Sequence, residues 1–206
     1  MTVDPIVMAA RTIVTLQTIV AREVNPFEPA VVTVGTFRAG TKRNIIADEA
    51  KLELTVRSYK TEVQKQLLAA IERIAKAEAA AARAPKEPLV AVDAKEASDV
   101  VVNDPALSAR LERALKRGLP EGGVGAANPS PGSEDFGVFG TAYGVPSVQL
   151  SLGTVEAGEF AKAKAEGRDT PGLHTAKFAP EREPTIRGGV SALTLSVLEL
   201  CGRAAR

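Results

Sequence analysis

Residues 50–57 alternate between apolar and polar side chains with a period of two. The apolar set is Ala50, Leu52, Leu54 and Val56. The polar set is Lys51, Glu53, Thr55 and Arg57. This alternation predicts a strand within about residues 45–59 that buries one face and exposes the other. A run of β-branched residues at 30–38 comes before it, and the turn signal Ala39-Gly40-Thr41 follows that run. The two runs therefore predict two neighbouring strands of one short antiparallel sheet.

Helical patterns flank these strands. Asp4 as N-cap and Pro5 in the first turn predict the start of one helix. Its apolar stripe is Ile6, Ala9, Ile13, Leu16 and Val20. A second helix is predicted over residues 61–82, with an inner face of Val63, Leu67, Ile71, Ile74 and Ala77. Residues 89–92 then read as a further strand. The order over residues 1–94 predicts an α/β (α+β) domain of ferredoxin-like βαββαβ type that lacks its first strand, whose place would lie before Met1.

The pattern changes beyond residue 94, which predicts a second domain over residues 95–206. Asp104 and Pro105 begin a helix that closes at Gly118, and a glycine- and proline-rich stretch follows. Residues 144–154 read as a buried strand, and residues 155–170 as a lid-like insertion or a surface helix. A last helix is predicted over residues 183–201, with an inner face of Ile186, Val190, Leu193, Val197 and Leu200.

Composition excludes several classes of protein. The 26 lysines and arginines nearly balance the 25 aspartates and glutamates, so no strong field favours nucleic acid or an anionic membrane. No apolar run is long enough to span a bilayer, and the N-terminus lacks a signal-peptide pattern. The single cysteine, Cys201, rules out an internal disulfide framework and is typical of a reducing cytoplasm.

The residues that could carry chemistry are ambiguous one at a time. His174 is the only histidine and follows a long loop, which suits either a surface side chain or a site residue. Glu134 and Asp135 follow the glycine-rich stretch, where they could help cap a short helix led by Ser133 or orient a ligand. Asn44 and Arg57, 13 positions apart, could be solvated polar side chains or a ligand clamp.

Taken together, the motifs resemble a known family. The segment from Thr2 to Tyr59 is similar to the lid, or dimerisation, domain of the dinuclear-metal amidohydrolases and peptidases. That family includes aminoacylases, hippurate hydrolases and indole-acetyl-amino-acid hydrolases. The stretches VVVNDPALSARLERAL, PSPGSEDFGVFG and LHTAKFAPEREPTIRGGVSAL resemble the end of its α/β zinc-hydrolase-type catalytic domain. The resemblance covers nearly the whole chain and implies hydrolysis of N-acyl amino acids or related small amides and peptides.

The resemblance also implies roles for single residues. Asn44 matches the lid asparagine that contacts substrate, and Arg57 matches the lid arginine that holds the substrate carboxylate through paired hydrogen bonds. His174 matches the last metal-ligating histidine. Glu134 and Asp135 match a supporting active-site segment. Two divalent ions (zinc, manganese or cobalt) would polarise the amide and activate water. A homodimer through the lid domain is implied as well.

The chain departs from the family pattern in its ligand count. One histidine and Cys201 cannot assemble a site that needs several imidazoles and carboxylates. The remaining ligands and the glutamate base are therefore expected in an N-terminal half that this chain does not contain. We expect the chain alone to be inactive, and its sheet to present an open edge that favours pairing. Three alternatives stay open: a non-catalytic dimerisation module, one half of a split enzyme, and a ferredoxin-like domain that binds a small ligand.

Overall fold

The computed structural model describes residues 2–130 and 132–202 and divides into two compact units. The first unit contains the residues up to Val101 together with the segment that ends at Val138, and the second contains residues 102–129 and 139 onward. Residues 132–138 therefore pack with the first unit although they follow the helix that begins the second. Each unit is described by itself.

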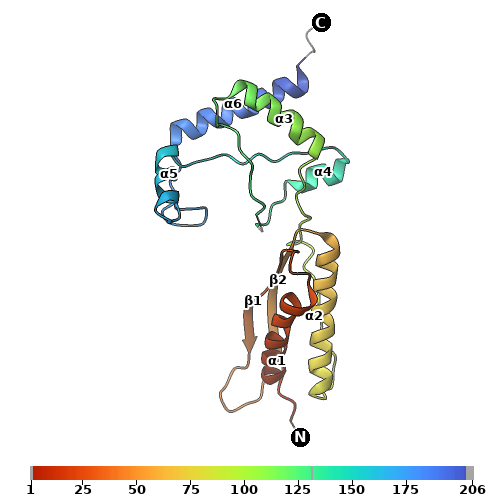
Figure 1. The fold of residues 1–206 in the computed structure, drawn as a ribbon. Helices are drawn as coiled ribbons and strands as arrows, with labels where there is room; N and C mark the ends of the chain where they lie inside the picture. The colour runs from red at the N-terminus through yellow and green to blue at the C-terminus, as the bar shows by residue number, and fades with distance from the viewer. Residues whose placement is uncertain (1, 131, 203–206) are drawn as a thin grey trace. The chain divides into compact units, whose positions relative to one another are not determined.

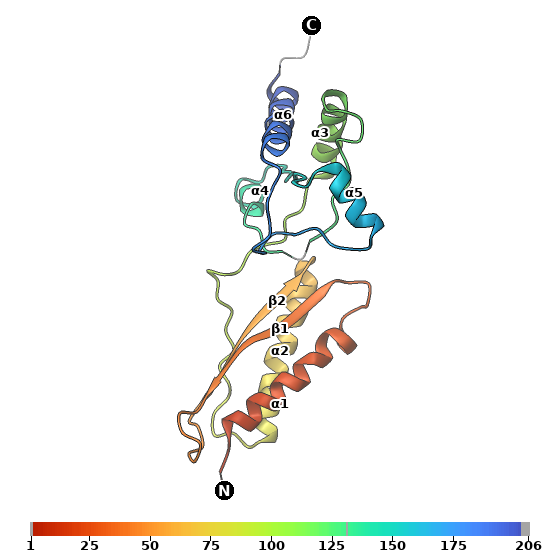
Figure 2. The same ribbon diagram turned by 90° about the vertical axis from the view of Figure 1, so that its left-hand side faces the viewer.

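The first unit is a two-stranded antiparallel sheet covered on one face by two helices (Figures 1 and 2). Strand β1 is Ala30–Ala39 and strand β2 is Ala50–Ser58. Their register pairs Val31 with Arg57 at one end and Ala39 with Ala50 at the other. A bulge lies between Val34 and Thr36, at Gly35. The predicted pair of strands is thus confirmed, although residues 45–49 belong to the connecting turn rather than to β2.

Helix α1 is Pro5–Thr18 and helix α2 is Thr61–Ala81. The carboxylate of Asp4 accepts a hydrogen bond from the backbone N–H of Ile6 at 2.9 Å, which confirms the predicted N-cap. A wider π-helical turn, η1 (Ile19–Glu23), continues α1. Because apolar residues recur at three- and four-residue steps along both helices, each helix can turn a continuous apolar stripe toward the sheet.

The core of the first unit lies between these helices and the sheet. Its fully buried side chains are Leu16, Ile19 and Leu67. Half-buried residues from the inner face of the sheet pack against them: Ala30, Val32, Val34, Leu54 and Val56. Three details differ from the sequence prediction. Ile6, the first residue of the predicted stripe on the first helix, is 39% exposed. Ile19 rather than Val20 closes that stripe, and Ala70 rather than Ala77 is buried on α2.

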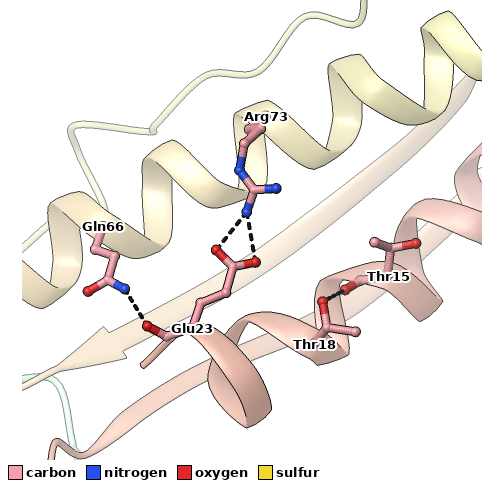
Figure 3. Close-up of polar contacts among 5 residues, drawn as sticks. All are labelled: Thr15, Thr18, Glu23, Gln66 and Arg73. Atoms are coloured by element: carbon pink, nitrogen blue, oxygen red, sulfur yellow. Dashed lines mark hydrogen bonds and ion pairs between the residues drawn. The ribbon is translucent and has the colours of Figure 1, made fainter. Parts of the chain in front are cut away.

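Polar contacts join the two helices along their edges. Figure 3 shows Nη2 of Arg73 donating to both carboxylate oxygens of Glu23 at 2.6 and 2.7 Å, and the Gln66 amide donating to the Glu23 carbonyl at 2.6 Å. Nearer the other end, Glu78 accepts from Arg11 and from the Thr15 hydroxyl, each at 2.8 Å. These contacts fix the end of η1 and the second half of α1 against α2.

The predicted strand at residues 89–92 does not form. Leu89 is 94% exposed and Val92 is 58% exposed, and the segment has no strand assignment. In a βαββαβ sheet the last strand pairs with the first strand and not with the central hairpin. No strand that could take the first position occurs in the described residues, so the 89–92 segment has nothing to pair with. The fold is accordingly a mixed α/β unit with two strands.

The second unit is built on two helices that pack side by side, α3 (Pro105–Gly118) and α6 (Arg182–Cys201) (Figures 1 and 2). Asp104 caps α3 by accepting from the Leu107 N–H at 2.7 Å, as predicted. Glu199 of α6 accepts from Arg110 and Arg117 of α3, each at 3.0 Å. The short helices α4 (Gly137–Tyr143) and α5 (Ala157–Ala165) complete the elements, and α5 confirms a surface helix within residues 155–170.

Two predictions for this unit are wrong. Residues 144–154 have no strand assignment. The predicted inner face of the last helix is its outer face, because Ile186, Val190, Leu193 and Val197 are each 58–65% exposed. Both patterns show that these residues are suited to burial, but residues 2–130 and 132–202 provide no layer that buries them. No helix in the described residues is long and apolar enough to cross a membrane.

Candidate functional site

Arg57 lies at the end of β2, on the face of the sheet that points away from α1 and α2. Its neighbours on the strand, Val56 and Leu54, belong to the inner face, and the period of two turns Arg57 outward. Its guanidinium Nη1 lies 3.4 Å from the hydroxyl of Ser133, to which it donates a long hydrogen bond. A half-buried arginine thus meets the polar segment that starts at Gly132.

Glu134 and Asp135 follow Ser133 in that segment and are exposed. One carboxylate oxygen of Glu134 accepts from the backbone N–H groups of Asp135 and Phe136 at 3.1 and 3.2 Å. The Asp135 carbonyl accepts from the Val138 N–H at 3.1 Å at the start of α4. Glu134 therefore caps this turn, in keeping with the predicted capping role of the paired acidic residues. Within the described residues, the second carboxylate oxygen of Glu134 and the Asp135 carboxylate accept no hydrogen bond.

The outer face of the sheet carries a second polar group near its middle. Glu53 accepts a hydrogen bond from Thr36 across the strands at 2.7 Å and forms an ion pair with Lys51 at 2.9 Å. Hydrogen bonds from Lys51 and Thr36, with the positive charges of Lys51 and Arg38, lower the pKa of Glu53 to about 2. Glu53 is therefore held as a carboxylate by neighbours that stabilise the strand pair.

Asn44 lies in the turn between β1 and β2. The turn opens with Gly40, whose positive φ of 72° favours glycine. Together with Asp4 and Ile6 at the start of α1, residues 39–46 line an open depression of about 620 Å³. Lys42 and Arg43 flank Asn44, so this end of the unit presents an amide between two cations. Within the described part of the chain, the Asn44 side chain makes no hydrogen bond.

Asn44 and Arg57 lie at opposite ends of the hairpin. The register places Ala50 at the turn end and Arg57 seven residues further along β2. At a rise of about 3.3 Å per residue, this puts the two side chains roughly 20 Å or more apart. A small molecule cannot contact both residues of the same chain. The structure therefore brings Arg57 together with Ser133 and its neighbours, but not with Asn44.

His174 belongs to the second unit, in the loop between α5 and α6. It is exposed, and its φ of +65° is uncommon for a residue other than glycine. The loop is tied by two short-range contacts, from the Thr175 hydroxyl to the Gly172 carbonyl at 2.9 Å and from the Phe178 N–H to the Thr175 carbonyl at 3.1 Å. His174 is therefore an accessible imidazole and not a packed side chain.

A metal centre does not assemble from the residues described. They contain no group of three or more histidine, cysteine, aspartate or glutamate side chains that could hold a metal ion. One imidazole supplies one ligand, whereas a zinc site needs at least three from protein. The residues present thus do not fit a dinuclear centre by themselves, and His174 can take part in one only if further ligands come from elsewhere.

Sequence reasoning missed the contact between Arg57 and Ser133. Ser133 immediately precedes the paired acidic residues, and the local pattern there predicts only the start of a short helix. No local pattern links a strand end to a loop more than 70 positions away. The clustering of Arg57 with the 132–138 segment is a property of the fold.

Residues 1–83 match the family model described as the peptidase dimerisation domain. The N-acetyldiaminopimelate deacetylase of Leuconostoc citreum is 32% identical over 191 residues, which are 92% of this chain and 44% of that protein. The N-acetyl-L-cysteine deacetylase of Bacillus subtilis is 47% identical over 64 residues, 31% of this chain and 15% of that protein.

A solved structure extends the similarity to the fold. The dinuclear metal-binding peptidase of the M20 family from Bacillus subtilis superimposes with a TM-score of 0.67 at 25% identity, covering 98% of this chain and 47% of that one. The chain thus spans less than half the length of these relatives. From the matched domain, the deacetylase relatives and the shared fold, we conclude that the chain is similar to the M20 peptidases over nearly its whole length and that its residues 1–83 match the dimerisation domain of that family.

Proposed function

We propose that this chain forms part of a metal-dependent amidohydrolase that cleaves the amide bond of N-acyl amino acids or related small amides and peptides. Residues 1–94 act as its lid and dimerisation domain, and residues 95–206 as the end of its catalytic domain. The similarity to deacetylases of N-acetylated amino acids supports the substrate class. The single cysteine is in keeping with action in the cytoplasm.

The position of Arg57 in the fold is the main observation that supports the proposal. Its guanidinium lies on the open face of the sheet and reaches the 132–138 segment, where Ser133 is its partner at 3.4 Å. A contact of that length is a weak hydrogen bond. A carboxylate would accept two parallel, charge-assisted hydrogen bonds from the same guanidinium. Arg57 is therefore suited to hold the carboxylate of an N-acyl amino acid, with Glu134 and Asp135 as supporting residues beside it.

The complete site is proposed to hold two divalent ions of zinc, manganese or cobalt. A dinuclear metal-binding relative with the same fold supports this expectation. His174 contributes one neutral imidazole ligand from its exposed loop, and the other ligands come from polypeptide outside this chain, because the described residues supply no further cluster.

A homodimer is proposed for the first unit. Its match to a dimerisation domain supports this partner. Val7 and Val14, seven positions apart on one face of α1, are 55% and 71% exposed, which leaves two apolar side chains uncovered. The distance between Asn44 and Arg57 is a second reason to propose a homodimer. If both contact one substrate, the two residues have to come from different copies of the chain.

A chimera tests the proposed activity. The aligned region of the Leuconostoc citreum deacetylase is replaced by this chain, and release of amino acid from N-acetyl amino acids is measured with zinc, manganese or cobalt. We expect turnover that is lost in His174→Ala and that shows a raised KM in Arg57→Ala. The control is Arg38→Ala, a change to an arginine at the other end of the sheet. A chimera that unfolds cooperatively and binds metal but hydrolyses none of these substrates would contradict the proposal.

A further inference from the structure

Arg57 lies in the second-last residue pair of the hairpin. The register pairs it with Val31, and only the pair of Ala30 and Ser58 lies beyond it. Two strands form the sheet within the described part of the chain, and a two-stranded hairpin has little stability of its own in water. Backbone hydrogen bonds open most easily at the ends of such an element. The position of the Arg57 guanidinium therefore depends on what holds this end of the sheet closed.

An ion pair crosses this end of the sheet just outside the strands. Nζ of Lys60 donates to Oε1 of Glu28 at 2.5 Å. Each residue lies two positions beyond the last pair of the register, so the contact adds one more link between the two strands. The Glu28 side chain is 25% exposed, which reduces the screening of the pair by water. We refer to Glu28 and Lys60 together as the end clamp.

Lys60 occupies a position that normally favours another type of residue. It is the N-cap of α2, where its carbonyl accepts from the Gln64 N–H at 3.0 Å, but its side chain makes no capping hydrogen bond. Serine, threonine, aspartate and asparagine are preferred at an N-cap, and a positive charge at this end of a helix is unfavourable. The carboxylate of Glu28 offsets that charge. The lysine thus leaves α2 without a side-chain cap and instead links the helix to the segment before β1.

A local turn places Glu28 opposite Lys60. The Glu28 N–H donates to the Asn25 carbonyl at 2.8 Å, and the Phe27 N–H donates to the Asn25 side-chain oxygen at 3.0 Å. Asparagine in the first position and proline in the second, here Pro26, favour a turn of this kind. The sequence around residue 25 therefore determines where the Glu28 carboxylate lies.

The segment of residues 24–29 is tied to α2 at both of its ends. At the η1 end, Arg73 holds the carboxylate of Glu23 and Gln66 holds its carbonyl (Figure 3). At the β1 end, the end clamp joins the segment to the N-cap of the same helix. Helix α2 begins three positions after the last residue of β2. The last pairs of both strands are therefore anchored to one helix.

We propose that Glu28 and Lys60 are positioning residues for Arg57. The end clamp keeps the last pairs of the hairpin closed, and it thereby holds the guanidinium in place for the carboxylate of an N-acyl amino acid. It acts through the backbone of β1 and β2. The inference rests on the proposed function, since it explains how the proposed carboxylate-binding arginine is held. An ion pair that only stabilised the fold would affect the whole unit, whereas the end clamp should affect residues 29–32 and 56–59 first.

Lys60→Ser separates positioning from stability. It removes the ion pair but supplies a preferred N-cap side chain, so the urea midpoint of the isolated 206-residue chain should stay the same or rise. Amide hydrogen exchange, followed by mass spectrometry, should nevertheless become about threefold faster in residues 29–32 and 56–59. In the chimera with the Leuconostoc citreum deacetylase, KM for N-acetyl amino acids should rise about three- to fivefold, while kcat changes by less than about twofold. KM for the corresponding amino-acid amides should not change.

Two further variants check the assignment. Glu28→Lys breaks the same ion pair from its other side and should raise KM by a similar factor. Combining Glu28→Lys with Lys60→Glu restores an ion pair with reversed charges, and KM should return to within about twofold of that of the unsubstituted chimera. Lys76→Ser is the matched control. It removes a lysine that pairs with Glu72 at 2.9 Å, roughly 24 Å further along α2, and should leave KM and the exchange of residues 56–59 within about twofold.

The outcomes distinguish the inference from the proposed function. Unchanged exchange of residues 29–32 and 56–59 in Lys60→Ser, or faster exchange with an unchanged KM, would overturn the inference. So would an equal rise in KM for the amino-acid amides, or a lower urea midpoint with faster exchange throughout the first unit, which would show a purely structural role. The expected exchange in the isolated chain would support the end clamp even where the unsubstituted chimera hydrolyses no N-acetyl amino acid, a result that would contradict the proposed function alone.

Discussion

The Nη1 atom of Arg57 lies 3.4 Å from the Ser133 hydroxyl, although the two residues are 76 positions apart in the chain. This contact joins the end of a lid strand to the loop that carries Glu134 and Asp135. It makes the loop part of the first unit and places acceptor groups beside the guanidinium. Arg57, the predicted substrate-binding arginine, therefore lies next to the segment that contains the predicted supporting residues Glu134 and Asp135.

Replacing this guanidinium should affect substrates with a free carboxylate most. In the chimera, we expect Arg57→Lys to raise KM for N-acetyl amino acids by roughly ten- to a hundredfold, because an ammonium group cannot donate the paired hydrogen bonds. The corresponding amino-acid amides, which lack the carboxylate, should change little. Steady-state kinetics on the two substrate series measures the difference. An equal loss for both series would show that Arg57 does not recognise the carboxylate.

The core of the first unit should be sensitive to the loss of volume at Leu67. Leu67 is fully buried between α2 and the sheet, so Leu67→Ala should lower the free energy of unfolding by about 2–5 kcal/mol. Leu89 is 94% exposed, and Leu89→Ala should change that free energy by less than about 0.5 kcal/mol. Urea unfolding of the isolated chain compares the two. Similar values for both variants would mean that the helices do not pack on the sheet as described.

Glu53 should make the free energy of unfolding fall as the solution is acidified. The pKa of Glu53 is lowered to about 2 from a model-compound value of 4.5. The unfolded chain therefore binds a proton at Glu53 at a higher pH than the folded chain does. The stabilisation is complete above about pH 4.5 and is lost as the pH falls toward 2. In urea unfolding from pH 6 to pH 3, the loss of stability on acidification should be smaller in Glu53→Gln than in the unsubstituted chain. An identical pH profile would contradict the Lys51 and Thr36 contacts.

The chain by itself should not hydrolyse amides. A single accessible imidazole, His174, cannot hold two metal ions, and the described residues offer no other ligand cluster. The purified 206-residue protein, incubated with N-acetyl amino acids and zinc, manganese or cobalt, should release no more amino acid than the metal alone. Metal-dependent turnover that disappears in His174→Ala would show that the chain assembles a working centre without help.

The outer face of α1 should determine oligomeric state. Val14 is 71% exposed, and Val14→Asp is expected to shift the chain from dimer to monomer because it places a charge in the proposed apolar interface. Ala69→Asp, at an exposed position on α2, is the control and should remain dimeric. Light scattering across a concentration series measures the mass. A chain that is monomeric without any substitution would contradict the proposed homodimer.

The elements that formed as predicted are those with local causes. Asp4 and Asp104 cap their helices, and the alternation around Leu54 sets the face of β2 that packs on the core. The predictions that are wrong concern burial. Val92 lies in a segment that forms no strand, and Leu193 lies on a helix that forms as predicted but turns this side chain outward. Both residues have the spacing of buried residues, yet both are exposed. An apolar pattern shows that a segment is suited to burial, but it does not show that a covering layer exists.

In the candidate site, too, local features could be predicted from the sequence but contacts between distant segments could not. Arg57, Glu134, Asp135 and His174 could be identified from the sequence through a family resemblance, and their roles stay predictions. Their placement could not be derived from the sequence. Asn44 and Arg57 are close in sequence but lie at opposite ends of a hairpin, whereas Arg57 and Ser133 are distant in sequence but lie in contact. Spacing along a strand gives the face of a side chain and its distance along the strand, but it does not give its neighbours from other segments.

The Asn103 amide pairs with the 147–152 segment in the way that the backbone of a neighbouring strand would. A carboxamide carries the same donor and acceptor as a peptide group, so this one side chain both donates to the Gln149 carbonyl and accepts from the Gln149 N–H. The edge of the segment beside Asn103 is therefore closed to pairing with another strand.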